Sequence, residues 1–206
     1  RLLLQRGARV ALTSRNEAAL KHLAHGKALV AVADITDRAS LQAAFDDICA
    51  TFGGIDLAIV NAGTHLPVRA WELDAIAAEK LVQVNLIGAM NVSALLAPYF
   101  AQSGGGRLAI TARVAGLVYG ATKAALINFA ETLYLDLAPK GVAVHLINPG
   151  FVKTPLTDLN DFRMPALIGA DEAAREILAG IERGAFEIHF PKRFTHVLKL
   201  LNLLPY

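Results

Sequence analysis

The sequence predicts a doubly wound α/β fold, with a mostly parallel sheet covered by helices on both faces. Short runs rich in Val, Ile, Leu and Ala alternate along the chain with longer segments of helical periodicity. Strands that are apolar on both faces are typical of parallel sheets buried between two layers of helices. The 206 residues contain no internal repeat, low-complexity tract or linker, so we expect a single domain over residues 1–206.

Local signals mark the ends of several elements. Residues 1–6 fit the last turns of a helix with Gly7 at its C-cap, and Asp37 can cap a helix that Gly53-Gly54 ends. We expect strands at residues 10–13, 29–33, 57–61, 107–112, 142–148 and 186–190. We expect helices at residues 16–24, 37–52, 73–103, 119–137 and 171–183, the third bent near Pro98 and the last capped by Asp171. This alternation indicates a sheet of the Rossmann type.

The composition excludes several classes of protein. With 54% apolar and 18% charged residues the chain is globular, and its net charge is only +2. No basic cluster is interleaved with aromatic residues, so we expect no nucleic-acid partner. The six histidines lack metal-ligand spacing, and we expect no metal. Cys49 is the only cysteine and shares a helical stripe with Phe45, Ile48 and Phe52, which favours a core thiol over a catalytic one.

No segment indicates export or a membrane span. No uninterrupted apolar stretch reaches about 18 residues, and residues 1–7 are too short and wrongly flanked for a signal peptide. We therefore expect a cytoplasmic protein. The apolar tail at residues 194–206, near Lys192-Arg193, could contact a membrane surface or another subunit, but packing against its own domain is favoured.

The pair Tyr119 and Lys123 is the first candidate for chemistry. Residues four apart stack on one face of a helix, so the phenol and the ammonium would lie side by side. A free tyrosine has a pKa of about 10, and an adjacent cation lowers it toward the working range. Such a pair can act as an acid–base unit. This spacing alone is weak evidence for a catalytic role, because a tyrosine and a lysine four residues apart occur by chance on many exposed helices.

Other motifs in the sequence support a catalytic role for this pair. Asn61-Ala62-Gly63 follows an apolar strand, and Val84-Asn85 lies 24 residues later in a helix. Asn148-Pro149-Gly150 follows another apolar strand, with Thr154 shortly after it. In this order and spacing, together with Y-x-x-x-K, the motifs resemble the short-chain dehydrogenase/reductase family over nearly the whole chain.

The resemblance implies an oxidoreductase that transfers a hydride between NADP(H) and a carbonyl or alcohol substrate. Tyr119 would exchange a proton with the substrate oxygen, and Lys123 would lower the tyrosine pKa and bind the nicotinamide ribose. Asn85 would hold a water that relays protons to the lysine. His65 follows the N-A-G turn and could face the substrate, although an ordinary loop histidine is favoured. Residues 155–169 resemble a lid over the substrate.

The cofactor residues follow from the same resemblance. Ser14-Arg15 follow the second strand of the family, where an acidic residue would repel a 2′-phosphate and an arginine accommodates it. This favours NADP over NAD. Asp34 resembles the aspartate that flanks the adenine. The remaining expected cofactor contacts are Asn61, Ala62, Gly63, Tyr119, Lys123, Pro149, Gly150 and Thr154.

Two parts of the family pattern are missing. The fold needs a first strand and a Gly-rich turn ahead of its first helix, and this sequence has neither. We expect about 20 to 25 residues to be absent there, with the loss of a central strand. The family serine that orients the substrate carbonyl is also absent. Either Arg113 replaces it, or it lies in a loop missing between Ala112 and Arg113. The second explanation is preferred, with Leu117-Val118 joined directly to Tyr119, because it accounts for the short spacing and for the arginine together. Thr111 lies deeper in its strand and is a poor substitute for the serine.

Alternatives to the enzyme remain open. A non-catalytic nucleotide-binding or scaffold protein on the same fold is the main one, and an epimerase or dehydratase is the third. In the family, two long helices pair between subunits. We therefore expect a homodimer or homotetramer with contacts at apolar positions such as Leu95, Leu126, Phe129 and Leu133.

Overall fold

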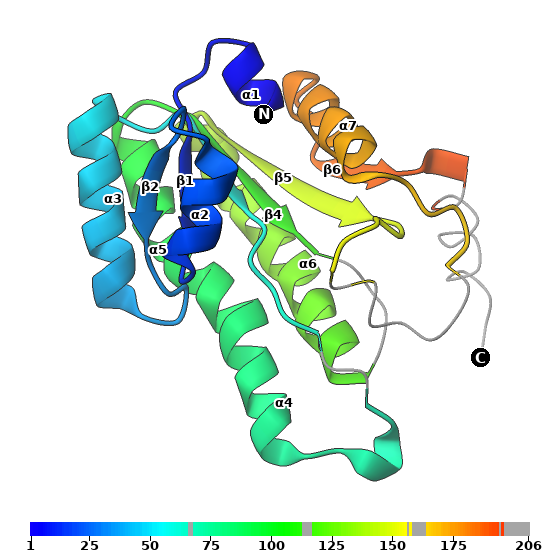
Figure 1. Ribbon diagram of the computed structural model, residues 1–206. Helices are drawn as coiled ribbons and strands as arrows, with labels where there is room; N and C mark the ends of the chain where they lie inside the picture. The colour runs from blue at the N-terminus through cyan, green and yellow to red at the C-terminus, as the bar shows by residue number, and fades with distance from the viewer. Residues whose placement is uncertain (66–67, 113–116, 156, 158–163, 194, 196–206) are drawn as a thin grey trace.

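The computed structural model describes residues 1–65, 68–112, 117–155, 157, 164–193 and 195 (Figure 1). Its strands form two parallel sheets, which confirms the α/β fold. β1 (Ala11–Ser14) pairs with β2 (Leu29–Val32) in the first sheet. The second sheet has the order β3-β4-β5-β6. Its strands are β3 (Leu57–Val60), β4 (Gly106–Thr111), β5 (Val142–Pro149) and β6 (Glu187–Phe190).

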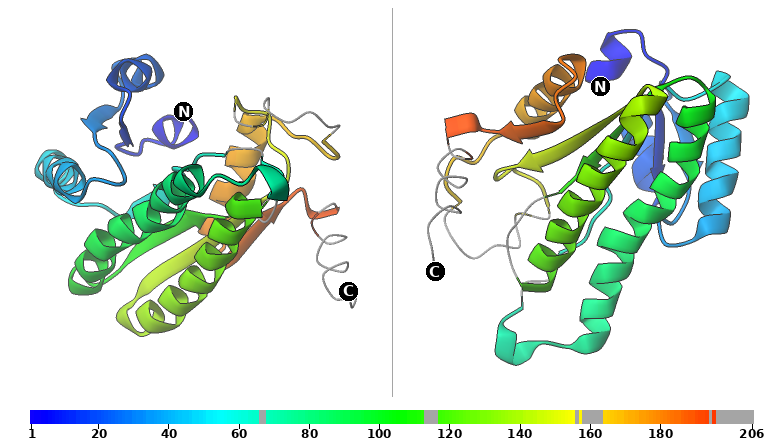
Figure 2. Two further views of the ribbon diagram at one scale, coloured as in Figure 1. Left: turned by 90° about the horizontal axis from the view of Figure 1, so that it is seen from below. Right: turned by 180° about the vertical axis from the view of Figure 1, so that it is seen from behind.

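Helices alternate with these strands. They are α1 (Leu2–Gln5), α2 (Glu17–Ala24), α3 (Arg38–Phe52), α4 (Ala75–Val82), α5 (Gly88–Gln102), α6 (Leu117–Leu137) and α7 (Ala170–Glu182). α5 and α6 cover one face of the four-stranded sheet, and α7 lies on the other face (Figure 2). The main core lies between α5, α6 and strands β4 and β5, where Phe100, Leu108 and Ile110 have no exposed surface.

Local capping signals account for several helix ends. Asn16 accepts a hydrogen bond from the backbone of Ala19, and Asp37 accepts one from Ala39, so both are side-chain N-caps as predicted for Asp37. Gly53 ends α3 in a left-handed conformation, with φ of 74°, which glycine adopts without steric cost. The prediction that Asp171 caps the last helix was wrong. Gly169 is the N-cap, and Asp171 lies in the first turn, where a carboxylate favours the helix dipole.

The long helix predicted from residue 73 to residue 103 is interrupted by a π-helical turn over Gln83–Ile87, between α4 and α5. A bend was expected at Pro98, which lies inside α5. Single π turns insert an extra residue into a helix and occur often at functional sites. Here the turn contains Asn85, which is one of the predicted site residues.

β1 and β3 each pair with only one strand among the described residues, so both have an edge without a strand partner. Ile59 in β3 is 38% exposed, although β-branched residues in a parallel sheet are usually covered. The two sheets therefore do not join through backbone hydrogen bonds between described strands.

Some apolar residues of the long helices serve the core. Leu126 is only 1% exposed, so the expectation that it contacts another subunit was wrong, because it packs inside its own domain. Phe129 and Leu133 are half-buried against the same core. Among the described side chains of α6, the large apolar residues that are exposed are Tyr134 and Leu135. Cys49 is half-buried, and burial raises the pKa of its thiol, in agreement with a structural role.

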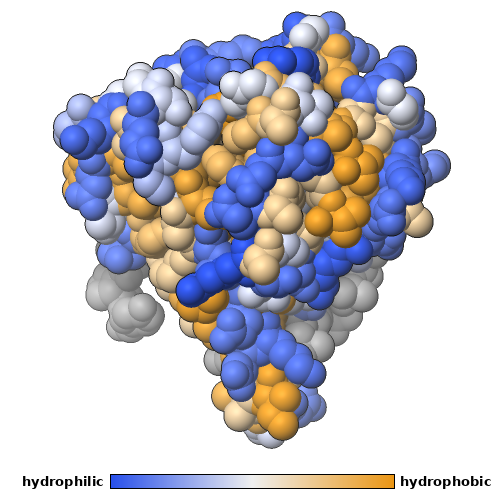
Figure 3. All heavy atoms as spheres, turned by 90° about the vertical axis from the view of Figure 1, so that its left-hand side faces the viewer, coloured by the Kyte–Doolittle hydropathy of each residue, from blue (hydrophilic) through white to orange (hydrophobic). Residues whose placement is uncertain are grey.

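The helical segment Ala75–Gln102 is long and apolar enough to cross a membrane by length and composition alone. Core helices of water-soluble proteins meet the same criterion. Asn85, Asn91 and Ser93 are all buried within this segment. α5 packs on β4, and its apolar residues Leu96 and Phe100 belong to the main core. Apolar side chains are exposed where α4 begins, at Leu73 and Ile76. In Figure 3 the segment where α4 begins forms the lower tip of the surface, and this tip carries apolar patches.

Candidate active site

The predicted site residues gather at one edge of the sheets, where the parallel strands end. Ser14 ends β1, Thr111 ends β4 and Pro149 ends β5, while Asn61 follows β3 directly. Asp34 lies two residues beyond β2. Ligands of open α/β sheets bind outside the carboxyl ends of the strands, so the topology places these residues where a binding site is expected.

Asn85 is the structural centre of the site. Its side chain has no exposed surface. The amide oxygen accepts a hydrogen bond of 2.7 Å from the backbone N–H of Thr64, and the amide nitrogen donates to the Thr64 carbonyl at 2.9 Å. The same nitrogen lies 3.4 Å from the hydroxyl of Thr122 on α6. Asn85 therefore joins the π turn, the loop after β3 and α6.

Lys123 is buried on α6, with 3% of its surface exposed. Its ammonium donates a hydrogen bond of 3.1 Å to the carbonyl of Thr111, at the end of β4. Burial lowers the lysine pKa to about 8. A cation held in a poorly solvated place acts strongly on its neighbours, because little water screens it.

Tyr119 lies one helical turn before Lys123, as predicted. The lysine Nζ is 5.6 Å from the centre of the tyrosine ring. The hydroxyl of Thr122 donates to the Tyr119 carbonyl at 2.8 Å, which stabilises this turn of α6. The structure thus brings Tyr119, Lys123 and Asn85 together in one cluster.

His65 also belongs to this cluster. Its ring packs edge-to-face on Tyr119, with ring centroids 4.9 Å apart and an angle of 67° between the planes. The sequence favoured an ordinary loop histidine, because periodicity says nothing about contacts between a loop and a helix 54 residues later. Thr64 and Thr122, which connect to Asn85, were missed for the same reason.

The turn Asn61-Ala62-Gly63 is exposed beside the cluster. Asn61 accepts a hydrogen bond of 3.0 Å from the hydroxyl of Thr111. A Cβ atom at Gly63 would lie 3.4 Å from the Asn85 amide oxygen and 3.5 Å from the Lys123 ammonium. These are ordinary contacts, so the protein around this turn leaves room for a side chain at Gly63, and its part in cofactor binding stays a prediction.

Arg15 and Asp34 face each other across the ends of β1 and β2. Their side chains form an ion pair of 3.6 Å, and the arginine side chain is 71% exposed. The pKa of Asp34 is lowered mainly by hydrogen bonds from the backbone N–H and hydroxyl of Thr36, and to a lesser degree by Arg15. The guanidinium is therefore accessible, and the carboxylate beside it is ionised at neutral pH.

The residues after β5 are fixed by local bonds. Gly150 is buried and donates its backbone N–H to the carbonyl of Phe190. The backbone N–H of Thr154 donates to the hydroxyl of Thr157 at 2.9 Å. Pro149 ends β5 at the carboxyl edge of the sheet and Gly150 follows it. Thr154 belongs to a small hydroxyl network. The part of all three residues in cofactor binding stays a prediction.

Several expectations lie outside the described residues. They concern the segment that follows Ala112, residues 113–116, much of the proposed lid and the tail at residues 196–206. Leu117, Val118 and Tyr119 are consecutive residues of α6. Among described residues, no group of three or more histidine, cysteine or acidic side chains could hold a metal. A cavity of about 350 Å³ lies between α7 and the end of β6, lined by residues that include Glu172 and Arg193, and none of its lining belongs to the Tyr119 cluster.

The fold and the site define a class of protein. A parallel α/β fold that brings a tyrosine and a buried lysine to the carboxyl edge of its strands has these groups where such folds bind ligands. The family model described as short chain dehydrogenase matches residues 1–162, which include the whole cluster. The chain belongs to the short-chain dehydrogenase/reductase family.

Individual relatives agree. The chain is 32% identical over 170 residues to an uncharacterized oxidoreductase of Staphylococcus epidermidis, covering 78% of this chain and 74% of that protein. It is 32% identical over 137 residues to 2-dehydro-3-deoxy-L-rhamnonate dehydrogenase (NAD(+)) of a Sphingomonas species, covering 63% of this chain and 55% of that protein. A short-chain dehydrogenase from Sphingobium yanoikuyae, solved in complex with NADPH, superposes with a TM-score of 0.82 at 25% identity, covering 100% of this chain and 90% of that chain. The protein is thus an oxidoreductase by family.

Proposed function

We propose that this oxidoreductase transfers a hydride between NADP(H) and a carbonyl or alcohol substrate, with Tyr119 as its acid–base residue. The observation that carries the proposal is the buried Lys123 ammonium beside the Tyr119 ring. A poorly screened cation favours the phenolate, so it makes the phenol a better proton donor to a carbonyl oxygen. The direct test is oxidation of NADPH by a panel of alicyclic and aromatic ketones, monitored by the absorbance of the reduced cofactor.

In this proposal the cofactor supplies the hydride to the carbonyl carbon. Tyr119 gives its proton to the carbonyl oxygen, and the Lys123 ammonium stabilises the phenolate that remains. Lys123 can then return a proton to the phenolate, because its own pKa of about 8 lies close to neutral pH. Asn85 fixes the loop after β3 against α6. The family resemblance implies that Asn85 also holds a water that would relay protons to Lys123.

The residues present fit the two ends of the cofactor. The accessible Arg15 guanidinium suits the 2′-phosphate of NADP, since a guanidinium pairs with phosphate through two parallel hydrogen bonds. Lys123 and the exposed Asn61-Ala62-Gly63 turn suit the nicotinamide ribose. The sequence has no Gly-rich turn, so the proposal assigns no residue to the pyrophosphate.

Arg15→Ala is expected to weaken NADPH binding about tenfold, which corresponds to about 1.4 kcal/mol, because one phosphate-binding cation is lost. NADH carries no 2′-phosphate, so its dissociation constant should change less than twofold. The measurement is cofactor titration by fluorescence. Arg175→Ala, which removes an exposed arginine on α7, is the matched control. Tighter binding of NADH than of NADPH by the unaltered protein would contradict the preference for NADP.

One observation favours a non-catalytic binding protein as the second candidate. The sequence between Ala112 and Tyr119 contains no serine, and the Thr111 hydroxyl donates a hydrogen bond to the side-chain oxygen of Asn61. A protein of this second kind would bind NADPH and show no turnover with any ketone of the panel. The two functions are therefore separated by measuring binding and turnover on the same sample.

We also propose a homodimer or homotetramer built through the long helices. The exposed Tyr134 and Leu135 on α6 are the residues that such a contact would cover, since the neighbouring Leu126 is already in the core. Leu135→Glu should shift the oligomer toward monomer in sedimentation velocity at micromolar concentration. An unaltered protein that sediments only as a monomer would contradict the proposal.

A further inference from the structure

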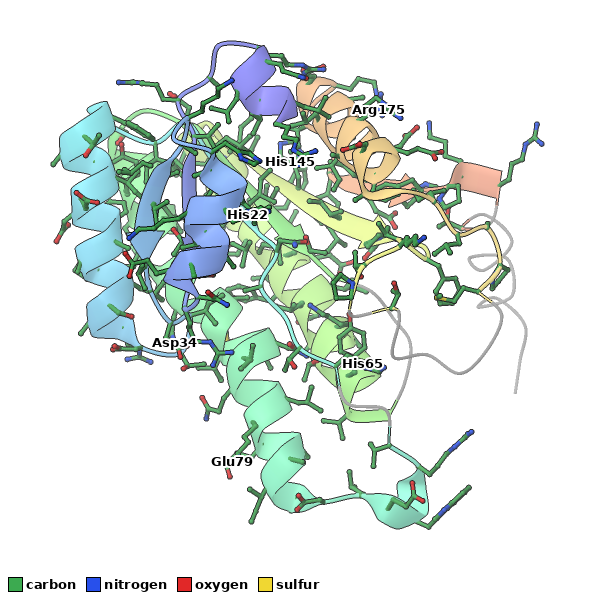
Figure 4. The ribbon with its side chains drawn as sticks, in the orientation of Figure 1. His22, Asp34, His65, Glu79, His145 and Arg175 are labelled. Carbon is green, nitrogen blue, oxygen red and sulfur yellow. The ribbon has the colours of Figure 1, made fainter. Side chains whose placement is uncertain are left out.

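A chain of hydrogen bonds through Asn85 and Thr122 holds His65 against Tyr119. The backbone N–H and carbonyl of the preceding residue, Thr64, are both hydrogen-bonded to the buried Asn85 amide. Asn85 also lies within hydrogen-bond distance of Thr122, whose hydroxyl binds the Tyr119 carbonyl. The loop that carries His65 is thus fixed to the same turn of α6 that carries Tyr119. Figure 4 shows His65 on this loop where it approaches the beginning of α6.

The contact puts an imidazole next to the phenol. The ring centroids lie 4.9 Å apart in an edge-to-face arrangement, and both side chains are half-buried. An imidazole always carries at least one N–H donor, whether neutral or protonated. A substrate carbonyl that accepts a hydrogen bond from the Tyr119 hydroxyl would therefore have the His65 ring as a neighbour.

The proposed reaction needs such a donor. Hydride addition places negative charge on the carbonyl oxygen, and donors aimed at that charge lower the barrier. A carbonyl oxygen has two lone pairs, so it can accept from two groups at once. The sequence offers no serine between Ala112 and Tyr119, and the Thr111 hydroxyl donates to Asn61.

We propose that His65 is a catalytic residue whose ring N–H donates a second hydrogen bond to the substrate carbonyl oxygen beside Tyr119. This inference rests on the function proposed above. The hydride comes from the nicotinamide and the proton from Tyr119, so His65 keeps its own proton throughout and no further reactant is needed. Its contribution is to stabilise the charge on oxygen and to orient the carbonyl.

The test separates the N–H donor from the shape of the ring. His65→Phe keeps an aromatic ring against Tyr119 and removes the donor, whereas His65→Gln and His65→Asn keep an amide N–H donor. His22→Phe is the matched control, because His22 is exposed on α2. We expect His65→Phe to lower kcat/KM for ketone reduction by a factor on the order of 10² to 10³. The affinity of His65→Phe for NADPH should stay within about twofold of that of the unaltered protein. At least one of the two amide variants should have a kcat/KM about tenfold higher than that of His65→Phe.

Three outcomes would overturn the inference while the proposed function stands. The first is a kcat/KM of His65→Phe equal to that of the unaltered protein. The second is a loss of NADPH affinity that accounts for the whole fall in kcat/KM. The third is that neither amide variant has a higher kcat/KM than His65→Phe. Failure of the unaltered protein to reduce any ketone is a different result. It would remove the proposed function itself, and the role of His65 with it.

Discussion

Tyr119→Phe is expected to lower kcat for ketone reduction by about 10³, because it removes the proton that the carbonyl oxygen takes up as the hydride arrives. The phenyl ring keeps the packing against His65 and the position over Lys123. NADPH affinity should therefore change little, and the free energy of unfolding should stay within about 1 kcal/mol. Steady-state kinetics and cofactor titration on the same preparations measure both quantities.

The matched control is Tyr134→Phe, which removes a hydroxyl from an exposed tyrosine of the same helix. It should leave kcat unchanged. Equal activity of Tyr119→Phe and the unaltered protein would show that another group supplies the proton. An equal loss of activity in Tyr119→Phe and Tyr134→Phe would indicate that the substitutions disturb α6, and that the loss does not come from a missing proton donor.

Lys123→Met is expected to abolish turnover and to stabilise the fold. Burial lowers the lysine pKa from 10.5 to about 8, which corresponds to a cost of about 3 kcal/mol for holding the charge in the folded protein. The substitution also removes the hydrogen bond to the Thr111 carbonyl, worth about 1 kcal/mol. We therefore expect a net gain of about 2 kcal/mol in the free energy of unfolding at neutral pH.

This gain should depend on pH in a defined direction. Below about pH 8 the lysine is protonated in both the folded and the unfolded chain, so the unaltered protein carries the full cost of burying the charge. As the pH rises from about 8 to 10.5, the folded protein loses the proton first and the cost disappears. The difference between Lys123→Met and the unaltered protein should therefore shrink over that range.

Urea unfolding at neutral pH and at about pH 10 measures this difference. Lys140→Met, at the exposed end of the turn after α6, is the control and should change stability by less than about 0.5 kcal/mol. A Lys123→Met variant that is less stable than the unaltered protein at neutral pH would contradict the account of a costly buried ammonium.

The parts of the fold that the sequence predicted are those that local chemistry decides. Asp37 and Gly53 bound α3 because a side-chain acceptor and a left-handed glycine satisfy the helix ends without help from the rest of the chain. The spacing of Tyr119 and Lys123 predicted their proximity for the same reason. The α/β class followed from apolar runs that alternate with helices.

The parts that the sequence did not predict depend on contacts between distant segments. The π turn at Gln83–Ile87 turns Asn85 toward the loop after β3, and nothing in the helical periodicity of this stretch indicates it. Leu126 could be assigned to the core only once Phe100 and the strands were in place. The contact of His65 with Tyr119 depends on the Thr64–Asn85 bridge, which joins residues 21 apart.

The central claim is that a hydride moves from the nicotinamide to a carbonyl carbon in a site completed by Tyr119 and Lys123. The most direct measurement uses NADPH that carries deuterium at the transferable position of the nicotinamide, with 4-oxocyclohexanecarboxylate or acetophenone as the acceptor, followed by mass spectrometry and NMR of the product. The account predicts an alcohol with deuterium on the carbinol carbon, formed by the unaltered protein and not by Tyr119→Phe. Bound cofactor without any alcohol, or an alcohol that contains no deuterium at that carbon, would contradict it.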